Sequence, residues 1–243
     1  VRQCDLASLD SVESFATGVT QEYDAIDVLC NNAGVMAIPR QETEDGFEKQ
    51  LGVNHLGHFA LTGHLLDLLV GSDADARIVT HSSAAPESGE IDFDDLHREQ
   101  SYGRWEAYGQ SKLANLLFAY ELQRRLEAAD VTETISVACH PGYAATNLQY
   151  RGPKQDGSAL RMGAMKLANA LVGQSAQQGA LPLLYASVAP DVAGGDYYGP
   201  DGVMSMRGAP EKQSSNEASY DESVAKRLWE TSEALTGVAY ELG

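Results

Sequence analysis

Short apolar runs alternate along the chain with longer stretches of helical period. Three runs are typical of strands, and each is followed by turn residues: Ile26–Cys30 by Asn-Asn-Ala-Gly, Arg77–His81 by Ser-Ser, and Ile135–Cys139 by His-Pro-Gly. Apolar runs of about four to eight residues that end in turn chemistry indicate strands buried on both faces of a parallel sheet. We expect a further strand at Val1–Cys4.

The stretches between these runs predict helices. One helical face, with the spacing i, i+3, i+4, i+7, is carried within Glu106–Ala128 by Leu113, Leu116, Leu117 and Tyr120. The other expected helices are Gly46–Val70, Met162–Val188 with a kink at Pro182, and Glu222–Leu235. The glycine-rich segment Gly194–Gly208 is expected to be a loop near the functional site.

The alternation of strands and helices predicts an α/β fold in which helices cover both faces of a parallel sheet. We therefore expect a doubly wound, Rossmann-like sheet. The 243 residues contain neither a repeat nor a low-complexity linker, and their number suits a single domain across 1–243. No apolar run approaches the roughly 18 residues that a membrane-spanning helix needs.

The chain carries 35 acidic and 17 basic residues, for a net charge of -18. Such a chain repels phosphates, so nucleic acid is not expected as a partner. The acidic composition resembles that of proteins from salt-loving organisms, and because salt screens like charges, we expect stability to rise with salt. The three cysteines, Cys4, Cys30 and Cys139, are expected to be reduced and buried, which favours a cytoplasmic location.

Tyr108 and Lys112 stand four residues apart in a predicted helix and therefore share one face. A free tyrosine has a pKa of about 10, and a nearby ammonium favours the phenolate and lowers that pKa. Such a tyrosine can protonate a carbonyl oxygen or deprotonate an alcohol. A Tyr-x-x-x-Lys pair also occurs by chance, so the pair alone is weak support for an enzyme.

Other signals stand in order around this pair. A strand ending in Asn-Asn-Ala-Gly comes first, then Asn54 in a helix, a strand ending in Ser82-Ser83, the Tyr108 pair, and a strand ending in Pro141-Gly142. In kind and order they resemble the short-chain dehydrogenase/reductase family over nearly the whole chain. Residues 54–59, 91–95 and 108–115 look like its retinol dehydrogenase branch.

The resemblance implies hydride transfer between NAD(P)(H) and a carbonyl or alcohol, with a hydrophobic small molecule as substrate. Tyr108 would be the acid/base, and Lys112 would also hold the ribose of the nicotinamide. Ser83, rather than its neighbour Ser82, would hydrogen-bond the substrate oxygen, where negative charge develops. Asn54 would support a water that links Lys112 to solvent.

The resemblance also implies a cofactor site, to which Tyr108 and Lys112 contribute. Asp5 would contact the adenine. The residues expected beside the adenosine ribose are Asn31, Ala33 and Gly34, and those expected to cover the nicotinamide are Pro141, Gly142 and Thr146. Glycine in such a turn lets the backbone approach a ligand closely. The branch slightly favours NADP over NAD.

Structural alternatives stay open for several of these residues. Asp5 could cap only a turn or a helix, Asn54 could be a surface helix residue, and Ser82 and Ser83 could simply end a strand.

The histidines could suggest a metal site, since His55 and His58 share a helical face near His64. No carboxylate or cysteine is spaced to complete such a site, so no metal is expected. His81 and His140 flank the expected active site, and we expect both to be packed or solvated.

The family's glycine-rich pyrophosphate turn, Thr-Gly-x-x-x-Gly-x-Gly, is absent from this sequence. Its first residues match the family's third strand, so we expect that the chain as given lacks the first two βα units and that the working protein starts upstream. The strand at Ile26–Cys30 would then be an apolar edge, which is prone to aggregation. The residues that select NAD or NADP belong to the missing part.

Two other functions share this pattern. Nucleotide-sugar epimerases and dehydratases share Tyr-x-x-x-Lys but usually carry a longer C-terminal domain than the 131 residues after Lys112. A catalytically inactive nucleotide-binding protein on this fold would tend to lose the tyrosine or the lysine, and this chain keeps both. By resemblance, helices at Gly46–Val70 and Glu106–Ala128 would pair subunits in a homodimer or homotetramer.

Overall fold

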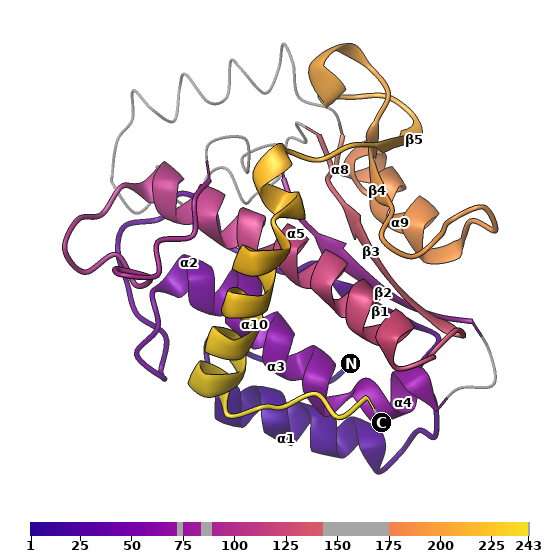
Figure 1. Cartoon of the computed structure of the whole chain (residues 1–243), viewed down its shortest axis with the longest axis horizontal. Helices are drawn as coiled ribbons and strands as arrows, with labels where there is room; N and C mark the ends of the chain where they lie inside the picture. Colours follow the sequence, from indigo (N-terminus) through magenta and orange to yellow (C-terminus); the bar gives the residue numbers. More distant parts are fainter. Residues whose placement is uncertain (72–74, 84–88, 143–174, 243) are drawn as a thin grey trace.

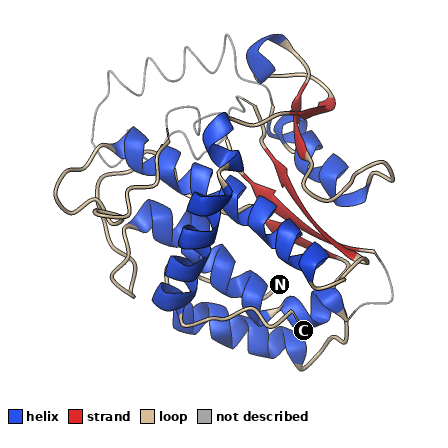
Figure 2. Cartoon of the chain, in the orientation of Figure 1, coloured by secondary structure: helices blue, strands red, loops and turns tan. Residues whose placement is uncertain are grey.

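The computed structural model describes residues 1–71, 75–83, 89–142 and 175–242, which contain one five-stranded sheet in the order β1-β2-β3-β4-β5 (Figure 2). The parallel strands are β1 (Val28–Asn31), β2 (Ala76–His81), β3 (Thr134–Cys139) and β4 (Tyr197–Pro200), and β5 (Pro210–Gln213) runs antiparallel to β4. The predicted parallel sheet is therefore confirmed, and the three apolar runs are strands at nearly their predicted positions.

Two predictions along the sheet are wrong. Val1–Cys4 forms no strand, because none of the described strands pairs with this largely exposed segment, and a strand needs a neighbour for its backbone hydrogen bonds. Gly194–Gly208 is not wholly a loop, since it contains β4 and a short 3-10 turn, η3 (Val203–Ser205). β4 pairs with β3, and the rings of Tyr197 and Tyr198 are buried. This burial favours a strand although glycines lie on both sides of the two tyrosines.

Four consecutive segments account for the predicted helix Gly46–Val70. They are α2 (Lys49–Leu51), the π-helix η1 (Gly52–Leu56), α3 (Gly57–His64) and α4 (Leu66–Val70). The helix begins later than predicted because Gly46 adopts a turn with a φ of 84°, and the Glu48 side chain caps the first turn by accepting from the Leu51 N–H at 2.7 Å. π-helices are rare and are frequent at functional sites.

The predicted helices at Glu106–Ala128 and Glu222–Leu235 are confirmed as α5 (Arg104–Ala128) and α10 (Glu222–Thr236). The 3-10 turn η4 (Glu217–Tyr220) precedes α10, which begins after its N-cap Asp221. The sequence pattern does not anticipate α1 (Leu9–Thr20), which begins after its N-cap Ser8.

Pro182 stands where the helix is interrupted, at the position of the predicted kink. It lies in the first turn of α9 (Leu181–Val188), which follows the short helix α8 (Ala176–Gly179). A first-turn nitrogen has no intrahelical partner to lose, so proline begins a helix there without penalty. Residues 162–174 of the predicted helix lie outside the described residues.

Alternate residues of β2 face two different helical layers. Ile78 packs in one cluster with Phe118 of α5, whereas Val79 packs in another with Ala186 of α9. Successive strand side chains point to opposite faces, so α5 and α9 cover opposite faces of the sheet. Figure 1 shows α10 lying across α5, on the outside of that layer.

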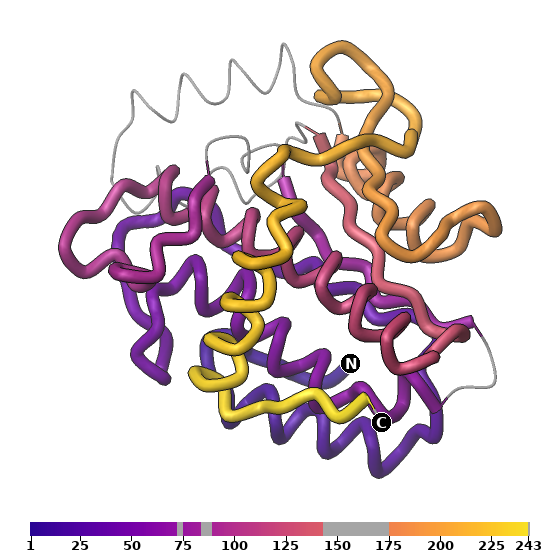
Figure 3. Tube along the Cα trace, viewed as in Figure 1, coloured from indigo at the N-terminus to yellow at the C-terminus, as the bar shows by residue number. Residues whose placement is uncertain are grey.

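The C-terminal part of the chain covers the helical layer of α5. Side chains of α5 are buried without interruption from Ala107 to Gln123. Figure 3 follows the chain from α10 into a final segment that crosses α3, where the Tyr240 hydroxyl donates to the Phe59 carbonyl at 2.7 Å. The chain itself covers α5 from Ala107 to Gln123, and the pairing of subunits that the family resemblance implies stays a prediction.

β1 is the edge strand of the described sheet, as expected for Ile26–Cys30. This position leaves Cys30 exposed, which corrects the expectation that it is buried. Cys139 in β3 is buried, Cys4 is half-buried, and each of the three has a free thiol.

Candidate active site

The carboxyl end of β2 meets the first turns of α5. Lys112 Nζ donates to the His81 carbonyl oxygen at 3.0 Å, and Asn115 Nδ2 donates to the same oxygen at 3.0 Å. In the other direction, Ser82 Oγ donates to the Lys112 carbonyl at 2.9 Å. These bonds tie the helix to the end of the strand and fix the position of Lys112 beside it.

The two neighbouring serines have different surroundings. Ser82 is buried, and its hydroxyl donates a hydrogen bond to a backbone carbonyl of α5. Ser83 is half-buried, and its side chain is hydrogen-bonded to the side chain of Tyr108. Its carbonyl accepts from the Tyr197 hydroxyl at 3.4 Å. The structure therefore brings Ser83, and not Ser82, together with Tyr108.

Burial decides the protonation of the tyrosine and the lysine. Tyr108 is 4% exposed, and burial raises the pKa of its phenol, while the hydrogen bond with Ser83 opposes that rise. Burial lowers the pKa of Lys112 from 10.5 to about 8. The expectation that Lys112 lowers the pKa of Tyr108 is wrong for this structure, because desolvation of the phenol prevails. At neutral pH the phenol keeps its proton, which is the form that can protonate a carbonyl oxygen.

Asn54 lies in the π-helix η1 and is fully buried, which excludes the reading of a surface residue. Its side chain accepts from the Val35 N–H at 2.8 Å and donates to the Val35 carbonyl at 2.9 Å and to Ser111 Oγ at 2.9 Å. Both backbone groups of Val35 are thereby held by one amide. The loop that follows β1 is clamped to η1 and α5.

The glycine of this loop lies against the same amide. A Cβ atom on Gly34 would stand 2.9 Å from Asn54 Oδ1 and 3.7 Å from Lys112 Nζ. Ala33 is exposed. Asn31, at the end of β1, is fully buried and donates through Nδ2 to Thr62 Oγ1 at 2.9 Å, while its Oδ1 has no hydrogen-bond partner. The end of β1 is therefore buried at Asn31, whereas the turn that follows is exposed at Ala33.

Asp5 is exposed and organises a turn before α1. Its Oδ1 accepts from the Ala7 N–H at 2.9 Å, and its carbonyl accepts from the Ser8 N–H at 3.1 Å. The structure therefore shows the local turn role that the sequence left open, and it does not bring Asp5 into contact with the Tyr108 cluster.

The turn after β3 is fixed by a histidine. Gly142 has a φ of 65°, and its N–H donates to His140 Nδ1 at 3.3 Å. His140 Nε2 is 3.1 Å from Gln213 Oε1, and its ring stacks on Tyr197 at 5.2 Å between centroids. His140 is thus packed, as expected, and it positions Gly142 and the preceding Pro141. Thr146 lies outside the described residues.

Sequence reasoning named His140 beside the site but missed its partner Gln213. Gln213 lies far along the chain from His140, and no local pattern marks either of them as partners. Gly199 leaves room for this histidine, since a Cβ there would stand 1.8 Å from His140 Nε2.

Three histidines near Lys112 are neutral at pH 7. Desolvation lowers the pKa of His55 to about 3, that of His58 to about 4 and that of His81 to about 3. The charge of Lys112 lowers the last two further. Within the described ranges, no group of three or more His, Cys, Asp or Glu residues could hold a metal ion.

None of the helices that the structure describes combines the length and the apolar character needed to cross a membrane.

The chain is similar to a known protein family and to several known proteins. A family model described as short chain dehydrogenase matches residues 1–156. Retinol dehydrogenase 14 of Mus musculus is 44% identical over 240 residues, which cover 98% of this chain and 67% of that protein. Polyprenol dehydrogenase of Mus musculus is 43% identical over 236 residues, which cover 96% of this chain and 67% of that protein. A crystal structure of an uncharacterised protein from Mycobacterium Paratuberculosis has a TM-score of 0.76 and 40% identity, and the match covers 99% of this chain and 76% of that one.

These matches do not favour the nucleotide-sugar epimerase or the inactive nucleotide-binding protein. They agree with the parallel sheet that the structure describes. This chain belongs to the short-chain dehydrogenase/reductase family, and it is an oxidoreductase of the NAD(P)-dependent type that transfers hydride between the cofactor and a small carbonyl or alcohol.

Proposed function

We propose that Tyr108 is the acid/base of the reaction and that Ser83 holds the substrate oxygen. The observation that carries this proposal is the hydrogen bond between the two side chains, one from the end of β2 and one from α5. Two hydroxyls that meet in this way can both point to one substrate oxygen. Ser83 donates where negative charge develops, and Tyr108 gives a proton in reduction or takes one in oxidation.

In this proposal Lys112 acts on Tyr108 and on the ribose of the cofactor. Its ammonium is buried and donates a hydrogen bond to the His81 carbonyl. This bond holds the ammonium at a fixed position beside Gly34. Because its pKa falls to about 8, its proton is held loosely and can be exchanged near neutral pH. Asn54 holds the Gly34–Val35 turn and thereby supports the same place.

The residues after β1 fit a nucleotide. Ala33 is exposed, so a ribose can approach this turn, and Asn31 fixes the end of β1 through its hydrogen bond to Thr62. Gly34 completes this turn, Pro141 and Gly142 would cover the nicotinamide, and Asp5 would contact the adenine. When bound, the nicotinamide cofactor supplies or takes up the hydride. NADP is the favoured cofactor of this proposal.

The substrate of this proposal is a hydrophobic aldehyde, ketone or alcohol. Its support is the likeness to proteins named retinol dehydrogenase and polyprenol dehydrogenase, at 44% and 43% identity. Both names denote alcohols with a large hydrocarbon part. The cytoplasmic location and the pairing of subunits stay predictions.

Replacing Tyr108 by phenylalanine tests the proposal, with Tyr120→Phe as the matched control. Tyr120 is a buried tyrosine of the same helix whose hydroxyl bonds Ser215 at 2.8 Å, away from Ser83. Turnover of aldehydes and ketones with NADH and with NADPH should fall by about 100-fold or more in Tyr108→Phe. Cofactor binding, followed by the fluorescence of the reduced nicotinamide, should be unchanged.

Tyr120→Phe should keep most of the turnover. Full activity of Tyr108→Phe, or equal losses in both variants, would overturn the assignment of the acid/base. Higher turnover with NADH than with NADPH would overturn the cofactor preference alone.

A further inference from the structure

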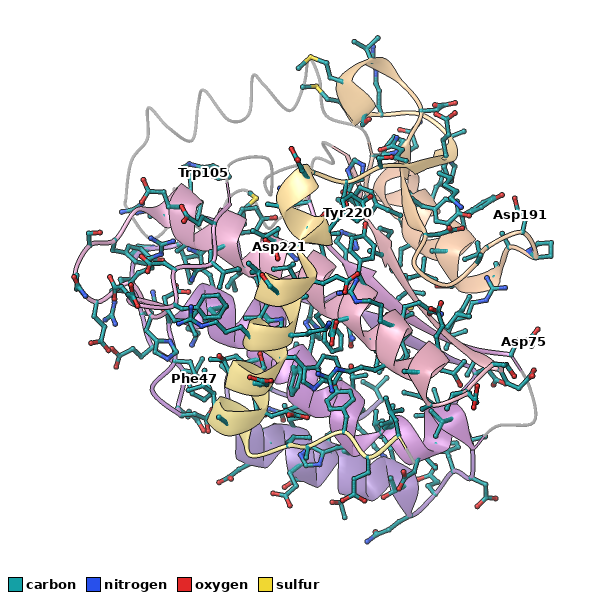
Figure 4. All side chains as sticks on the ribbon, viewed as in Figure 1. Phe47, Asp75, Trp105, Asp191, Tyr220 and Asp221 are labelled. Carbon is teal, nitrogen blue, oxygen red and sulfur yellow. The ribbon has the colours of Figure 1, made fainter. Side chains whose placement is uncertain are left out.

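We propose that Trp105 is a specificity-determining residue: its indole is the wall on which the apolar body of the substrate lies. The inference rests on the proposed function, since it assigns the substrate's hydrocarbon part to a place next to Tyr108. Trp105 is 58% exposed, whereas Trp229, the other tryptophan of the chain, is 2% exposed and packed in the core. Figure 4 shows Trp105 at the outer edge of the first turn of α5.

The indole adjoins the proposed acid/base directly. Trp105 stands three residues before Tyr108, so the two side chains lie on one helical face, one turn apart. Their ring centroids are 6.0 Å apart, with the planes at 81° in an edge contact. A substrate whose oxygen reaches the Tyr108 hydroxyl would therefore extend its next carbons along the tryptophan.

The backbone that carries Trp105 is held firmly. Gln50 Nε2 donates to the Arg104 carbonyl at 3.0 Å and to the Tyr102 hydroxyl at 2.9 Å, and Gln50 Oε1 accepts from the Ala37 N–H at 2.7 Å. Tyr102 in turn donates to the buried carboxylate of Glu48 at 3.0 Å. One buried amide thus joins the start of α5 to the loop after β1.

This clamp places an exposed aromatic ring beside the loop proposed to bind the cofactor. Val35 is held by Asn54 and Ala37 by Gln50, and half-buried Met36 lies between them in the chain. Apolar and aromatic side chains with a few fixed polar groups are the usual lining of small-molecule sites. An aromatic side chain buries about 150–250 Å² when covered, so the exposed part of this indole offers a large apolar area to a ligand.

A substrate with a long apolar chain should use the indole more than a short one. We expect Trp105→Ala to lower kcat/KM for decanal by about 10-fold while leaving kcat/KM for butanal within about 2-fold. Trp105→Phe keeps an aromatic face and should lose less than Trp105→Ala. The expected change lies in KM, because the indole binds the unreactive part of the substrate.

Tryptophan fluorescence supplies a second readout that does not depend on turnover. Decanal with oxidised cofactor forms a complex that cannot exchange hydride, and its binding should shift the emission of the wild-type protein to the blue. Trp105→Phe should show no such shift, because buried Trp229 alone remains. Butanal should produce little change in either protein.

The outcomes separate this inference from the proposed function. If the wild-type protein reduces neither aldehyde, the proposed function fails. If the wild-type protein reduces both and Trp105→Ala loses neither, or loses both equally, the assignment of the indole is overturned. A change from dimer to monomer in Trp105→Ala, measured by light scattering, with decanal kinetics unchanged, would assign the ring to a second copy of the chain and also overturn it.

Discussion

Replacing Lys112 by methionine is expected to stabilise the fold while it removes activity. Lys112 is 4% exposed, and burial lowers its pKa from 10.5 to about 8. One pKa unit corresponds to about 1.4 kcal/mol, so keeping the charged form in the interior costs about 3 kcal/mol. Methionine loses the hydrogen bond to the His81 carbonyl, about 1 kcal/mol, but Asn115 still donates to that oxygen. The expected net gain at neutral pH is about 2 kcal/mol.

This gain should depend on pH in one direction. The folded pKa lies below the unfolded value, so between about pH 8 and 10.5 the unfolded protein binds more protons than the folded one. Wild-type stability therefore gains a contribution that rises with pH across that window. Below pH 8 both states hold the proton and the whole penalty applies. The advantage of Lys112→Met should be largest below pH 8 and should disappear toward pH 10.5.

Urea titrations followed by circular dichroism at neutral and at alkaline pH measure this difference. Tyrosines and cysteines titrate in both proteins, so subtraction isolates the lysine. The control is Lys226→Met, because Lys226 is exposed on α10 in an ion pair with Glu222 at 3.5 Å, and its effect should stay within about 0.5 kcal/mol. A loss of stability in Lys112→Met at neutral pH, or an equal gain at both pH values, would refute the reasoning.

Three further predictions concern stability. The histidines with lowered pKa, His55, His58 and His81, bind protons more weakly in the folded than in the unfolded state. The free energy of unfolding should therefore fall as pH drops from 6.5 toward about 4, by up to about 1.4 kcal/mol per pH unit for each histidine. Urea midpoints that stay constant down to pH 5 would contradict this. Asn54→Ala leaves both backbone groups of Val35 without their partners and should lower the free energy of unfolding by about 2–4 kcal/mol. The control Asn32→Ala, in the exposed part of the same loop, should lower it far less. Equal losses in urea titrations would argue against the role of Asn54 in holding the loop. The net charge of -18 should make the melting temperature rise between low and molar KCl, and a flat melting temperature would show that self-repulsion is unimportant.

Elements that are marked by their own side chains could be predicted. β2 and β3 are buried on both faces, so their apolar runs identify them without knowledge of their neighbours. α10 has one apolar face along its length, and α5 shows helical spacing at Leu113, Leu116, Leu117 and Tyr120. Elements that depend on a partner could not be predicted in this way: Val1–Cys4 has strand-like residues but no described neighbour, and β4 is glycine-rich but pairs with β3.

The sequence by itself determined the family and the chemistry, because the order of Asn54, Ser83, Tyr108 and Lys112 along the chain is specific enough to identify them. It left several roles open that depend on three-dimensional contacts. Only the tertiary structure decided that Ser83 meets Tyr108 while Ser82 bonds the backbone of α5.

The protonation of the site was also decided by the fold. A spacing of four residues indicates that an ammonium and a phenol are near each other, but the pKa of each depends on how completely the remaining chain removes water from it. Tyr108 and Lys112 are both buried in the folded chain, and desolvation is the main cause of the pKa shift of each. Desolvation is a property of the whole packed molecule, and no local pattern of residues records it.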